Sequence, residues 1–267
     1  MAFFQESNNP AQRGLIDRLI RRFGTPAWTA AMALMYVVGL SAYGVALVPA
    51  FAILERWGLP VWHAAAWWRL PAFAGVVVLS AFAWGFTLLV VVPIYNWVLP
   101  TRLHAFKGGY FTIASLPWFI HNSLFYLVRY TILPFVTLTP VGPLFLQAMG
   151  MKIGKRVRIG TEYFSDVNLI TLGDDVAIGG SATIFCHVAG GGHLIIAPVI
   201  IGARAQIGLR ATIMGDVHVG EDAVILAHSV LLPGTRVGPG ERWGGVPARQ
   251  ISKDEWSEYA RTVLRRV

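Results

Sequence analysis

The stretch IGARAQIGLRATIMGDVHVGEDAVILAHSVLLPGTRVGPGERWG, residues 201–244, repeats every six residues. An amphipathic helix repeats near 3.6 residues and a simple strand near 2, so neither explains a period of six. A bulky residue at every sixth position, often followed by Gly, is typical of a parallel β-helix of hexapeptide repeats. The repeated positions are Ile201, Ile207, Ile213, Val219, Ile225, Leu231, Val237 and Trp243.

The repeat begins near residue 151 and extends over the C-terminal part of the chain. Ile153-Gly154 opens it, a one-residue slip follows Ile159-Gly160, and Leu172-Gly173 resumes it. Three hexads form one triangular coil, and each coil rises about 4.8 Å. We therefore expect about five coils over residues 151–251, followed by a short helix over residues 252–267.

Composition indicates a membrane protein. The 267 residues are 55% hydrophobic and 13% charged, whereas typical soluble domains have about 25% charged residues. In such a chain the net charge of +8 points to membrane topology and anionic lipid. No basic run with interleaved aromatic residues marks a nucleic-acid surface, so no nucleic-acid partner is expected. A single cysteine excludes a disulfide framework within the chain.

Two uncharged segments, Ala27–Leu54 and Ala72–Leu99, are each longer than the roughly 20 residues that cross a bilayer as a helix. Tryptophans flank both segments, as interfacial aromatic residues do. We expect two transmembrane helices within an N-terminal region of residues 1–112; the alternative is a buried hairpin of a soluble protein. Residues 1–26 predict a short interfacial helix, with a frayed terminus as the alternative.

The distribution of basic residues orients the two predicted spans. Four arginines precede the first span, the connecting loop carries only Arg56 and Arg69, and Arg102 and Lys107 follow the second. The positive-inside rule then places both ends in the cytoplasm and the loop outside. The expected localisation is the cell inner membrane, multi-pass, with the repeat region cytoplasmic.

Residues 113–150 predict an amphipathic interfacial helix and a linker. Polar and aromatic residues fall within one arc at 100° per residue, and Arg129 is expected to face the lipid headgroups. A third spanning helix over residues 113–138 is the alternative, and a buried Arg129 would then be costly. The residues of the polar arc are Ser115, Trp118, Asn122, Tyr126 and Arg129.

The largest departure from the hexapeptide repeat is FCHVAGGGHLIIAP, residues 185–198. Ile184 precedes Ile201 by seventeen residues, one short of three hexads, so the phase of the repeat is lost here. Because a repeat array is stabilised by its repeats, departures from the pattern are candidate functional positions. The glycines at 190–192 allow the chain to bulge out or a ligand to approach closely.

Two histidines lie in this departure. A neutral imidazole at His187 is able to take a proton from an attacking hydroxyl or amine, and the alternative is a histidine of a surface loop. His193 has the same two interpretations. Cys186 is adjacent to His187, but neighbouring residues of an extended chain point to opposite faces. We therefore interpret Cys186 as a small buried hydrophobic residue.

The remaining histidines of the repeat do not predict a metal site. His218 and His228 are the other candidates beside His187 and His193. The sequence holds no short His-x-His or His-Glu-x-x-His spacing, which is the usual arrangement of histidine ligands. No metal is expected.

Residues 151–249, which close with RWGGVPAR at 242–249, resemble the left-handed β-helix hexapeptide acyltransferases. The resemblance implies left-handed winding, acyl-CoA as the donor, and a trimer with active sites between subunits. It also implies a histidine base in a loop between coils. His187 matches that position, because it follows Ile184 and lies one coil before Ile207.

The layout is also similar to two narrower groups. Apolar helices followed by a Gly-x-Lys-Ile-Gly entry at residues 150–154 and Asp-x-x-Leu-Ile-x-Leu-Gly-Asp at 166–174 resemble the C-terminal membrane region of poly-lysine-type synthetases. The chain more loosely resembles the acetyltransferases of exopolysaccharide pathways. These groups differ in acceptor, an amine against a sugar hydroxyl, and the sequence does not choose between them.

The predicted function is that of an integral membrane acyltransferase with His187 as general base. The donor is acyl-CoA, with acetyl-CoA expected first, and the acceptor is a sugar, a lipid-linked molecule or an amine. The expected partners are the lipid bilayer and two further copies in a homotrimer. The alternatives are an amide-forming transferase that uses a carrier-bound thioester, a metal-dependent hydratase of γ-carbonic-anhydrase type, and a non-catalytic membrane scaffold.

The other candidate site residues follow from charge and position. We expect arginines to meet the CoA phosphates, since guanidinium pairs well with phosphate, and a backbone N–H of the glycine run to hold the oxyanion. Solvated charge and coil-corner turns are the alternative interpretations. The acceptor-binding candidates are Asp166, Asn168 and His193, and the cofactor-binding candidates are Gly191, Arg210 and Arg249.

Overall fold

The structure, a computed structural model, describes residues 25–264. The described chain forms two compact units. The helical unit comprises residues 25–102 and 111–135, and the β-helix unit comprises residues 103–110 and 136–264. The two units differ from the predicted domains in the assignment of residues 103–110. Residues 103–110, expected to belong to the membrane region, belong to the β-helix unit.

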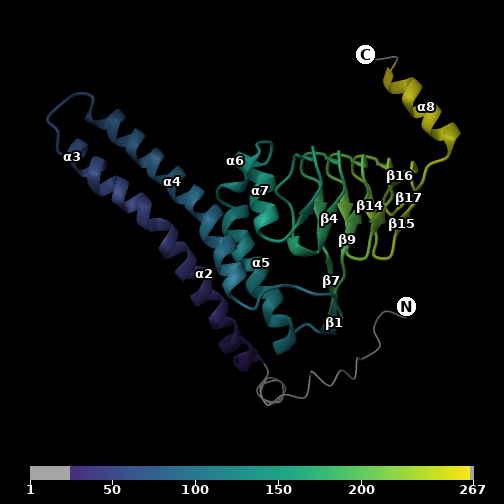
Figure 1. Cartoon of the computed structure of the whole chain (residues 1–267), viewed down its shortest axis with the longest axis horizontal. Coiled ribbons are helices and arrows are strands. Elements are labelled where there is room, and N and C mark those ends of the chain that lie inside the picture. The colour runs from purple at the N-terminus through teal and green to yellow at the C-terminus, as the bar shows by residue number, and fades with distance from the viewer. Residues whose placement is uncertain (1–24, 265–267) are drawn as a thin grey trace. The chain divides into compact units, whose positions relative to one another are not determined.

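The helical unit is built on two long helices, α2 (Thr25–Ile53) and α4 (Arg69–Val98), which lie side by side in Figure 1. By length and composition two segments of this unit, Met32–Trp62 and Arg69–Val98, are able to cross a membrane. Only 17% and 28% of their apolar windows are buried. The core helix of a soluble protein would bury most of that surface.

The connection between these helices is shorter than the predicted loop of residues 56–70. A π-helical turn, η2 (Leu54–Gly58), and a short helix, α3 (Leu59–Trp62), continue α2 without a break. Pro60 lies in the first turn of α3, directly after the π-helical turn, and the helix continues through it. The non-helical connection is therefore confined to residues 63–68.

The predicted amphipathic helix is α5 (Leu116–Arg129), preceded by the 3₁₀ turn η3 (Ile113–Ser115). Its 14 residues are fewer than the roughly 20 that cross a bilayer, so α5 is not a third span on its own. The predicted polar arc is partly buried in the structure, since Trp118 and Asn122 are buried together with the apolar side. Asn122 satisfies its amide within the helix, by donating to the carbonyl of Trp118 at 3.1 Å.

A buried polar cluster in the helical unit was not predicted from the sequence. His121 of α5 is fully buried, and its Nδ1 lies 2.8 Å from Oδ1 of Asn96 in α4. The hydroxyl of Thr101 donates to the same oxygen at 3.0 Å. These contacts fasten α5 to the end of α4 within the unit.

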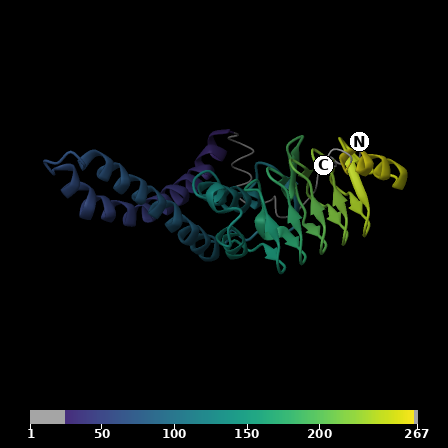
Figure 2. The same ribbon diagram turned by 90° about the horizontal axis from the view of Figure 1, so that it is seen from above.

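The β-helix unit contains three parallel sheets, one for each side of a triangular coil, and Figure 2 shows the rungs stacked in sequence order. α6 (Leu133–Val136) and α7 (Val141–Ala148) precede the first coil. The first sheet joins β2 (Lys152–Ile153), β4 (Ile170–Leu172), β9 (Val199–Ile201), β12 (His218–Val219) and β15 (Arg236–Val237). The second joins β3 (Arg158–Ile159), β5 (Ala177–Ile178), β10 (Gln206–Ile207), β13 (Val224–Ile225) and β16 (Arg242–Gly245). The third joins β6 (Thr183–Ile184), β11 (Thr212–Ile213) and β14 (Val230–Leu231).

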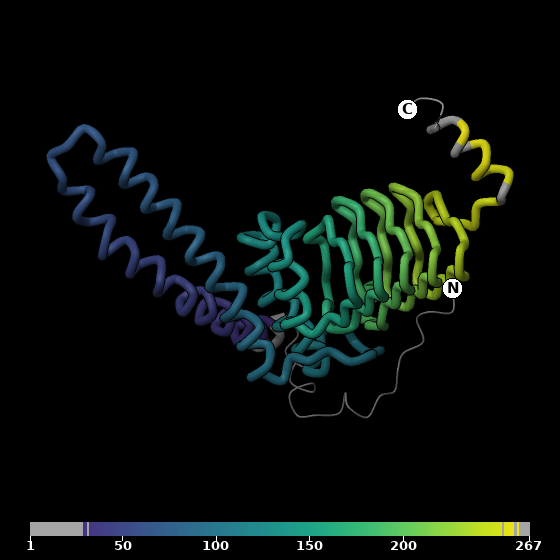
Figure 3. Tube along the Cα trace, turned by 45° about the horizontal axis from the view of Figure 1, so that its top comes forward, coloured from purple at the N-terminus to yellow at the C-terminus, as the bar shows by residue number. Residues whose placement is uncertain are grey.

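The register of these sheets follows the sixfold repeat. Ile207 pairs with Ile225 and Ile213 pairs with Leu231, one coil apart. The repeated aliphatic side chains fill the interior of the coil, where Ile213 and Leu231 are fully buried. The fold class predicted from the sequence, apolar helices followed by a hexapeptide-repeat β-helix of about five coils and a short terminal helix, is confirmed; Figure 3 traces the coils.

The corners of the coils place acidic and basic residues in the left-handed region of φ. Asp175 has φ of 58° and Arg204 has φ of 59°, a conformation that Asp adopts more readily than most residues. Ion pairs connect corners of successive coils: Arg156 with Asp175 at 2.6 Å, and Arg204 with Asp222 at 2.8 Å. The hydrogen bond from Arg156 lowers the pKa of Asp175, although both groups are exposed and the pair contributes little stability.

The prediction that the hexapeptide repeat is one residue short at residues 185–200 is wrong. Ile184 pairs with Ile213 in the next coil, and Leu172 pairs with Ile201. The sequence does not lose one residue here; it adds a β-hairpin. The hairpin consists of β7 (His187–Gly190) and β8 (His193–Ile196), and β1 (Phe106–Gly109) adds a third antiparallel strand along β8.

The C-terminal end of the β-helix carries a small hairpin and a helix. β17 (Ala248–Gln250) pairs antiparallel with β16, and α8 (Lys253–Leu264) follows. A capping box begins α8: the backbone N–H of Glu255 donates to the Ser252 hydroxyl at 3.2 Å, and the Ser252 N–H donates to the Glu255 carboxylate at 2.9 Å. The predicted interfacial helix over residues 1–26 lies almost entirely outside the described residues.

Candidate active site

The candidate site is a histidine–aspartate pair at the first residue of the inserted hairpin. Nδ1 of His187 lies 2.6 Å from Oδ2 of Asp166, and the backbone N–H of Cys186 donates to the same oxygen at 3.0 Å. The Asp166 side chain is fully buried, whereas that of His187 is 22% exposed. A carboxylate at Nδ1 keeps the proton on that nitrogen and leaves Nε2 as the lone-pair acceptor.

The local fold brings these two residues together from different coils. Asp166 has φ of 58° and begins the 3₁₀ turn η4 (Val167–Leu169) that leads into β4. Phe164 forms a parallel bridge with Ile184, so the segment before Asp166 lies beside the strand that leads to His187. The aspartate thus faces the entry to the hairpin because two neighbouring coils are in register there.

The coil relation assumed for His187 requires a correction. The N–H of Phe185 donates to the carbonyl of Ile213 at 3.1 Å, and a Cβ at Gly215 would lie 2.8 Å from the backbone of Cys186. His187 therefore lies one coil before Gly215, and not before Ile207. The inserted hairpin is the physical reason, because it shifts the residue numbers by more than the one position inferred from the sequence.

Cys186 supplies a backbone donor to the site. Its side chain is fully buried, as expected for a small hydrophobic residue. Burial raises the pKa of the Cys186 thiol well above its ordinary value, and the nearby charge of Asp166 raises it further. A thiol in this environment is a poor nucleophile. The chemistry of the site therefore rests on the imidazole.

The predicted acceptor-binding residues occupy three different environments. Asp166 is bound to His187, as described above. The amide of Asn168 donates to the carbonyl of Leu103 at 2.9 Å, so it binds the protein's own backbone. Nδ1 of His193 lies 3.0 Å from the carbonyl of Gly191 at the hairpin turn.

The predicted cofactor-binding residues are also dispersed. Gly191, with φ of 57°, lies in the hairpin turn, about 13 Å along the strand from His187 at roughly 3.3 Å per residue. Arg210 is an exposed coil-corner residue with φ of 53°. Arg249 of β17 forms an ion pair with Glu255 at 2.7 Å, and the hydrogen bond that it donates to Glu255 raises the pKa of this guanidinium. Gly191 is therefore not placed to hold an oxyanion beside His187.

The histidines of the β-helix do not converge on one point. His218 lies in β12 and His228 occupies a corner with φ of 59°. Within the described range, 25–264, no group of three or more His, Cys, Asp or Glu side chains is arranged to hold a metal ion.

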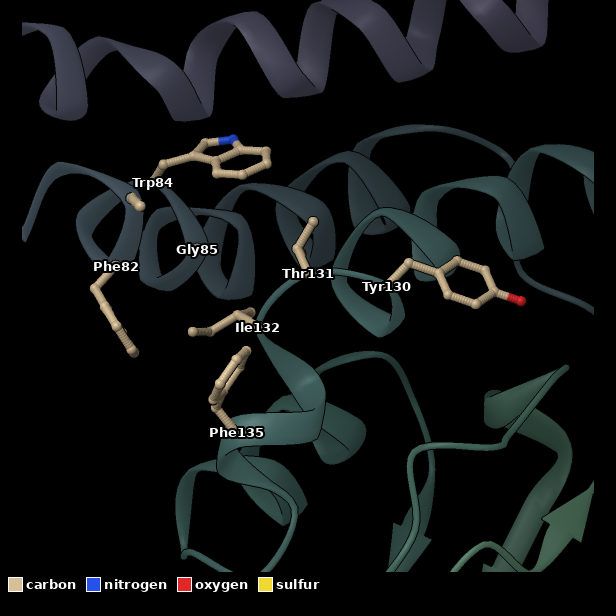
Figure 4. A pocket seen from close by; sticks show the side chains of 8 residues that line it. Phe82, Trp84, Gly85, Tyr130, Thr131, Ile132 and Phe135 are labelled. Carbon is tan, nitrogen blue, oxygen red and sulfur yellow. The ribbon is translucent and has the colours of Figure 1, made fainter. Parts of the chain in front are cut away.

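A pocket of ≈ 380 Å³ occurs in the helical unit, and Figure 4 shows its aromatic and aliphatic lining. Phe82 and Phe135 stand on either side of Ile132, and the rings of Phe82 and Phe135 are 5.9 Å apart. The lining is mostly aromatic and aliphatic and contains no carboxylate, imidazole or thiol. The histidine–aspartate pair remains the candidate for chemistry.

Comparison with curated proteins found two partial matches. The chain is 29% identical over 108 residues to delta-poly-L-ornithine synthetase of Acinetobacter baumannii, which covers 40% of this chain and 8% of that protein. It is 30% identical over 118 residues to an uncharacterised protein of Dictyostelium discoideum, with 37% and 47% of the two chains covered. The chain thus spans less than half the length of either relative. No family model matches the sequence.

The similar solved structures are hexapeptide-repeat acetyltransferases. One is the enzyme from Vibrio cholerae O1 biovar eltor in complex with acetyl-CoA, which is 27% identical, with a TM-score of 0.36. The match covers 39% of this chain and 60% of that chain.

Sequence reasoning selected Asp166 and His187 separately and missed that they form one unit. The signal available was the position of Asp166 at the start of the 166–174 motif, directly before a strand. The strand β1 within residues 103–110 had no signal of its own, because a four-residue strand that pairs with a distant hairpin has no periodicity to detect.

Proposed function

We propose that this chain is an acyltransferase that moves an acyl group from a CoA thioester to a hydroxyl or amine. The observation that carries the proposal is the 2.6 Å contact between Asp166 and Nδ1 of His187 on a hexapeptide-repeat β-helix. A partly exposed imidazole held by a buried carboxylate is the arrangement of a general base with its orienting group.

The proposed reaction is a direct transfer. Nε2 of His187 takes the proton from the acceptor's O–H or N–H as that atom attacks the thioester carbonyl. The carbonyl π electrons move to oxygen, then return as the C–S bond breaks, and the imidazolium gives its proton to the leaving CoA thiolate. Asp166 holds the ring and stabilises its charged form without taking the proton itself.

The donor is proposed to be acyl-CoA, with acetyl-CoA first. The resemblance of residues 151–249 to hexapeptide acyltransferases supports this choice. Arg210 is exposed, and the described residues show no ion pair for it. Its positive charge is therefore available to a CoA phosphate, which also supports this donor. Arg249 is the weaker phosphate ligand, since Glu255 already neutralises it. A homotrimer through the β-helix is proposed on the resemblance alone.

An amide-forming transferase that uses a carrier-bound thioester is the second candidate. Delta-poly-L-ornithine synthetase, one of the curated relatives, is named as a synthetase of an amino-acid polymer, which favours an amine acceptor. The same base would serve, because removal of a proton from nitrogen also promotes attack on a thioester. Sugar and lipid-linked acceptors are the other proposed classes.

The proposed location is the inner membrane, multi-pass, with the β-helix cytoplasmic. Two helices of sufficient length with largely exposed apolar surface support it. The arginines at positions 13, 18, 21 and 22 support the orientation by the positive-inside rule. The exposed apolar side chains of these helices include Leu40, Val48, Phe51, Val90 and Val98.

The decisive variants are His187→Ala and His187→Gln in the full chain. Both should lower turnover by roughly 10²–10⁴-fold, the usual share of general acid–base catalysis. His187→Gln keeps an amide donor for the buried Asp166 and guards against misfolding. His193→Ala is the matched control and should lose much less, because Nδ1 of His193 lies beside the Gly191 carbonyl at the hairpin turn.

The assay follows thiol release from acetyl-CoA in detergent, with sugar, amine and lipid-extract acceptors. Equal activity of the wild type and both His187 variants would contradict the histidine-base mechanism and favour a scaffold. Stoichiometric zinc in the purified protein, together with hydration of CO₂, would replace the proposal with the hydratase.

A further inference from the structure

The segment of residues 103–110 contacts the chain next to both members of the histidine–aspartate pair, at Asn168 and at β8. It follows the end of α4 at Val98 by four residues, yet it belongs to the β-helix unit. Leu103 at its start is 4% exposed and Gly108 is buried. We call residues 103–110 the β1 segment.

The first contact reaches the aspartate. Asn168, two residues after Asp166, donates from Nδ2 to the carbonyl of Leu103 at 2.9 Å. Asn168 lies in the turn η4, whose N-terminal residue is Asp166, and the N–H of Leu169 donates to the Asp166 carbonyl at 2.9 Å. The hydrogen bond to Leu103 therefore holds the turn that sets the direction of the Asp166 carboxylate.

The chain is adapted to accommodate the Asn168 side chain. Gly150 has φ of 102°, and a Cβ there would lie 2.9 Å from Cβ of Asn168. A larger residue at position 150 would displace the asparagine as well as strain the backbone. Asn168 thus occupies a specific place in the fold, between Gly150 and the β1 segment.

The second contact reaches the histidine. β1 pairs with β8, and β8 pairs with β7, so that Phe106, Ile196 and His187 form one row across the sheet. The N–H of Tyr110 donates to the carbonyl of Gly192 at 2.8 Å and extends the ladder to the hairpin turn. A two-stranded hairpin alone is marginally stable in water, whereas three strands give an ordered sheet.

We propose that the β1 segment is a positioning element for the proposed base: it fixes Asp166 through Asn168 and fixes His187 through the hairpin. Asn168 is then a positioning residue, and not the acceptor ligand expected from sequence. The inference rests on the proposed function. It adds that proton transfer at His187 depends on the β1 segment, which follows α4 in the sequence.

The positional test uses Asn168→Ala, with Thr161→Val as the matched control. Thr161 is buried and its hydroxyl donates to the carbonyl of Ala182 at 2.8 Å, so the control also removes a buried side-chain-to-backbone hydrogen bond of the β-helix. Asn168→Ala should lower kcat roughly 10²-fold, the effect of a misplacement of about 1 Å. It should leave KM for acetyl-CoA unchanged and displace the pH profile of kcat. Thr161→Val should change the stability of the protein but leave kcat and its pH profile unchanged.

A second measurement does not depend on knowing the acceptor. In ¹⁵N-histidine-labelled full-length protein, the proton on Nδ1 of His187 should give a low-field resonance, assigned by its loss in His187→Gln. That resonance should shift or broaden in Asn168→Ala and stay in place in Thr161→Val. An unchanged resonance in Asn168→Ala would overturn the positioning role, even if acyl transfer is confirmed. A shifted resonance in a protein without transferase activity would support the positioning role and refute the function.

A cross-link tests the docking of the segment itself. Lys107 and Ile195 are partners across β1 and β8, in a pair without hydrogen bonds between their backbones, and such pairs bring the Cα atoms within disulfide range. The variant Lys107→Cys/Ile195→Cys should form a disulfide under mild oxidation and keep the wild-type pH profile. Lys107→Cys/Leu194→Cys, one residue out of register, should cross-link poorly. The opposite order of yields would show that β1 is not docked in this register, and the proposal would fail.

Discussion

The contact between Asp166 and His187 depends on the surroundings of both side chains. The aspartate is buried and receives two donors, one from a ring and one from the backbone of Cys186. Water cannot replace the ring as a partner, because the carboxylate is not exposed. The imidazole is therefore held in one tautomer and one orientation, with its second nitrogen directed away from Asp166.

Asp166→Asn tests this coupling. The amide is close in shape to the carboxylate but offers a neutral oxygen and an N–H donor at the same place, and it stabilises a protonated ring less well. We expect turnover from acetyl-CoA to fall by roughly 10²–10⁴-fold with little change in thermal stability. Steady-state kinetics and a melting curve measure both. Full activity would show that the aspartate has only a structural role.

At the scale of elements, the C-terminal helix is attached by a small set of polar contacts. The Glu255 carboxylate accepts from Arg249 and from the N–H of Ser252. The hydrogen bond from Arg249, then that from Ser252, lowers the pKa of Glu255 to about 2. The guanidinium of Arg242 lies over the Trp256 ring at 4.6 Å and adds one further contact.

The depressed pKa of Glu255 predicts a pH dependence for the attachment of α8. A carboxyl whose folded pKa is below its unfolded value stabilises the fold above the unfolded pKa, near 4.5, and loses that contribution as pH falls toward 2. Limited proteolysis should therefore release α8 faster at pH 2 than at pH 6. Glu255→Gln should be cleaved rapidly at both pH values, and Asp254→Asn should behave as the wild type. Equal protection of Glu255→Gln and wild type at pH 6 would contradict this.

The elements with a period were predictable and the inserted ones were not. The interval of six between Ile207, Ile213 and Val219 predicts the strands, because successive residues of this kind fill the interior of the coil from its three sides in turn. The hairpin 187–196 has no period, and its glycine turn is compatible with a loop or a strand. The residue range of α5 was predicted approximately from the sequence. The burial of Trp118 and Asn122 was not, because it depends on packing against other elements, which the helical periodicity of α5 does not encode.

At the scale of the whole molecule, the orientation in the membrane is the first prediction. The connection between α2 and α4 is proposed to face outward and the β1 segment to face the cytoplasm. An impermeant maleimide should label Ala65→Cys in intact cells, and Lys107→Cys only after lysis. The native Cys186 is buried and should contribute little background. Labelling of Lys107→Cys alone in intact cells would reverse the orientation.

Assembly is the second prediction at this scale. A homotrimer through residues 151–249 is expected from the resemblance to hexapeptide acyltransferases. Light scattering with detergent correction should give a protein mass of three chains. Introduction of a charge at an exposed apolar β-helix residue, as in Leu209→Asp, where Leu209 is 50% exposed, should reduce that mass if the residue lies at the interface. A monomer at all concentrations would remove the trimer from the account.

The most direct test of the central claim compares thiol release from acetyl-CoA by the full chain and by its His187→Gln variant, in detergent, with a pool of amine and hydroxyl acceptors. The account predicts acceptor-dependent release by the wild type and a loss of roughly 10²-fold or more in the variant, while both proteins bind CoA equally in a thermal-shift assay. Release that is the same in both proteins would contradict the account.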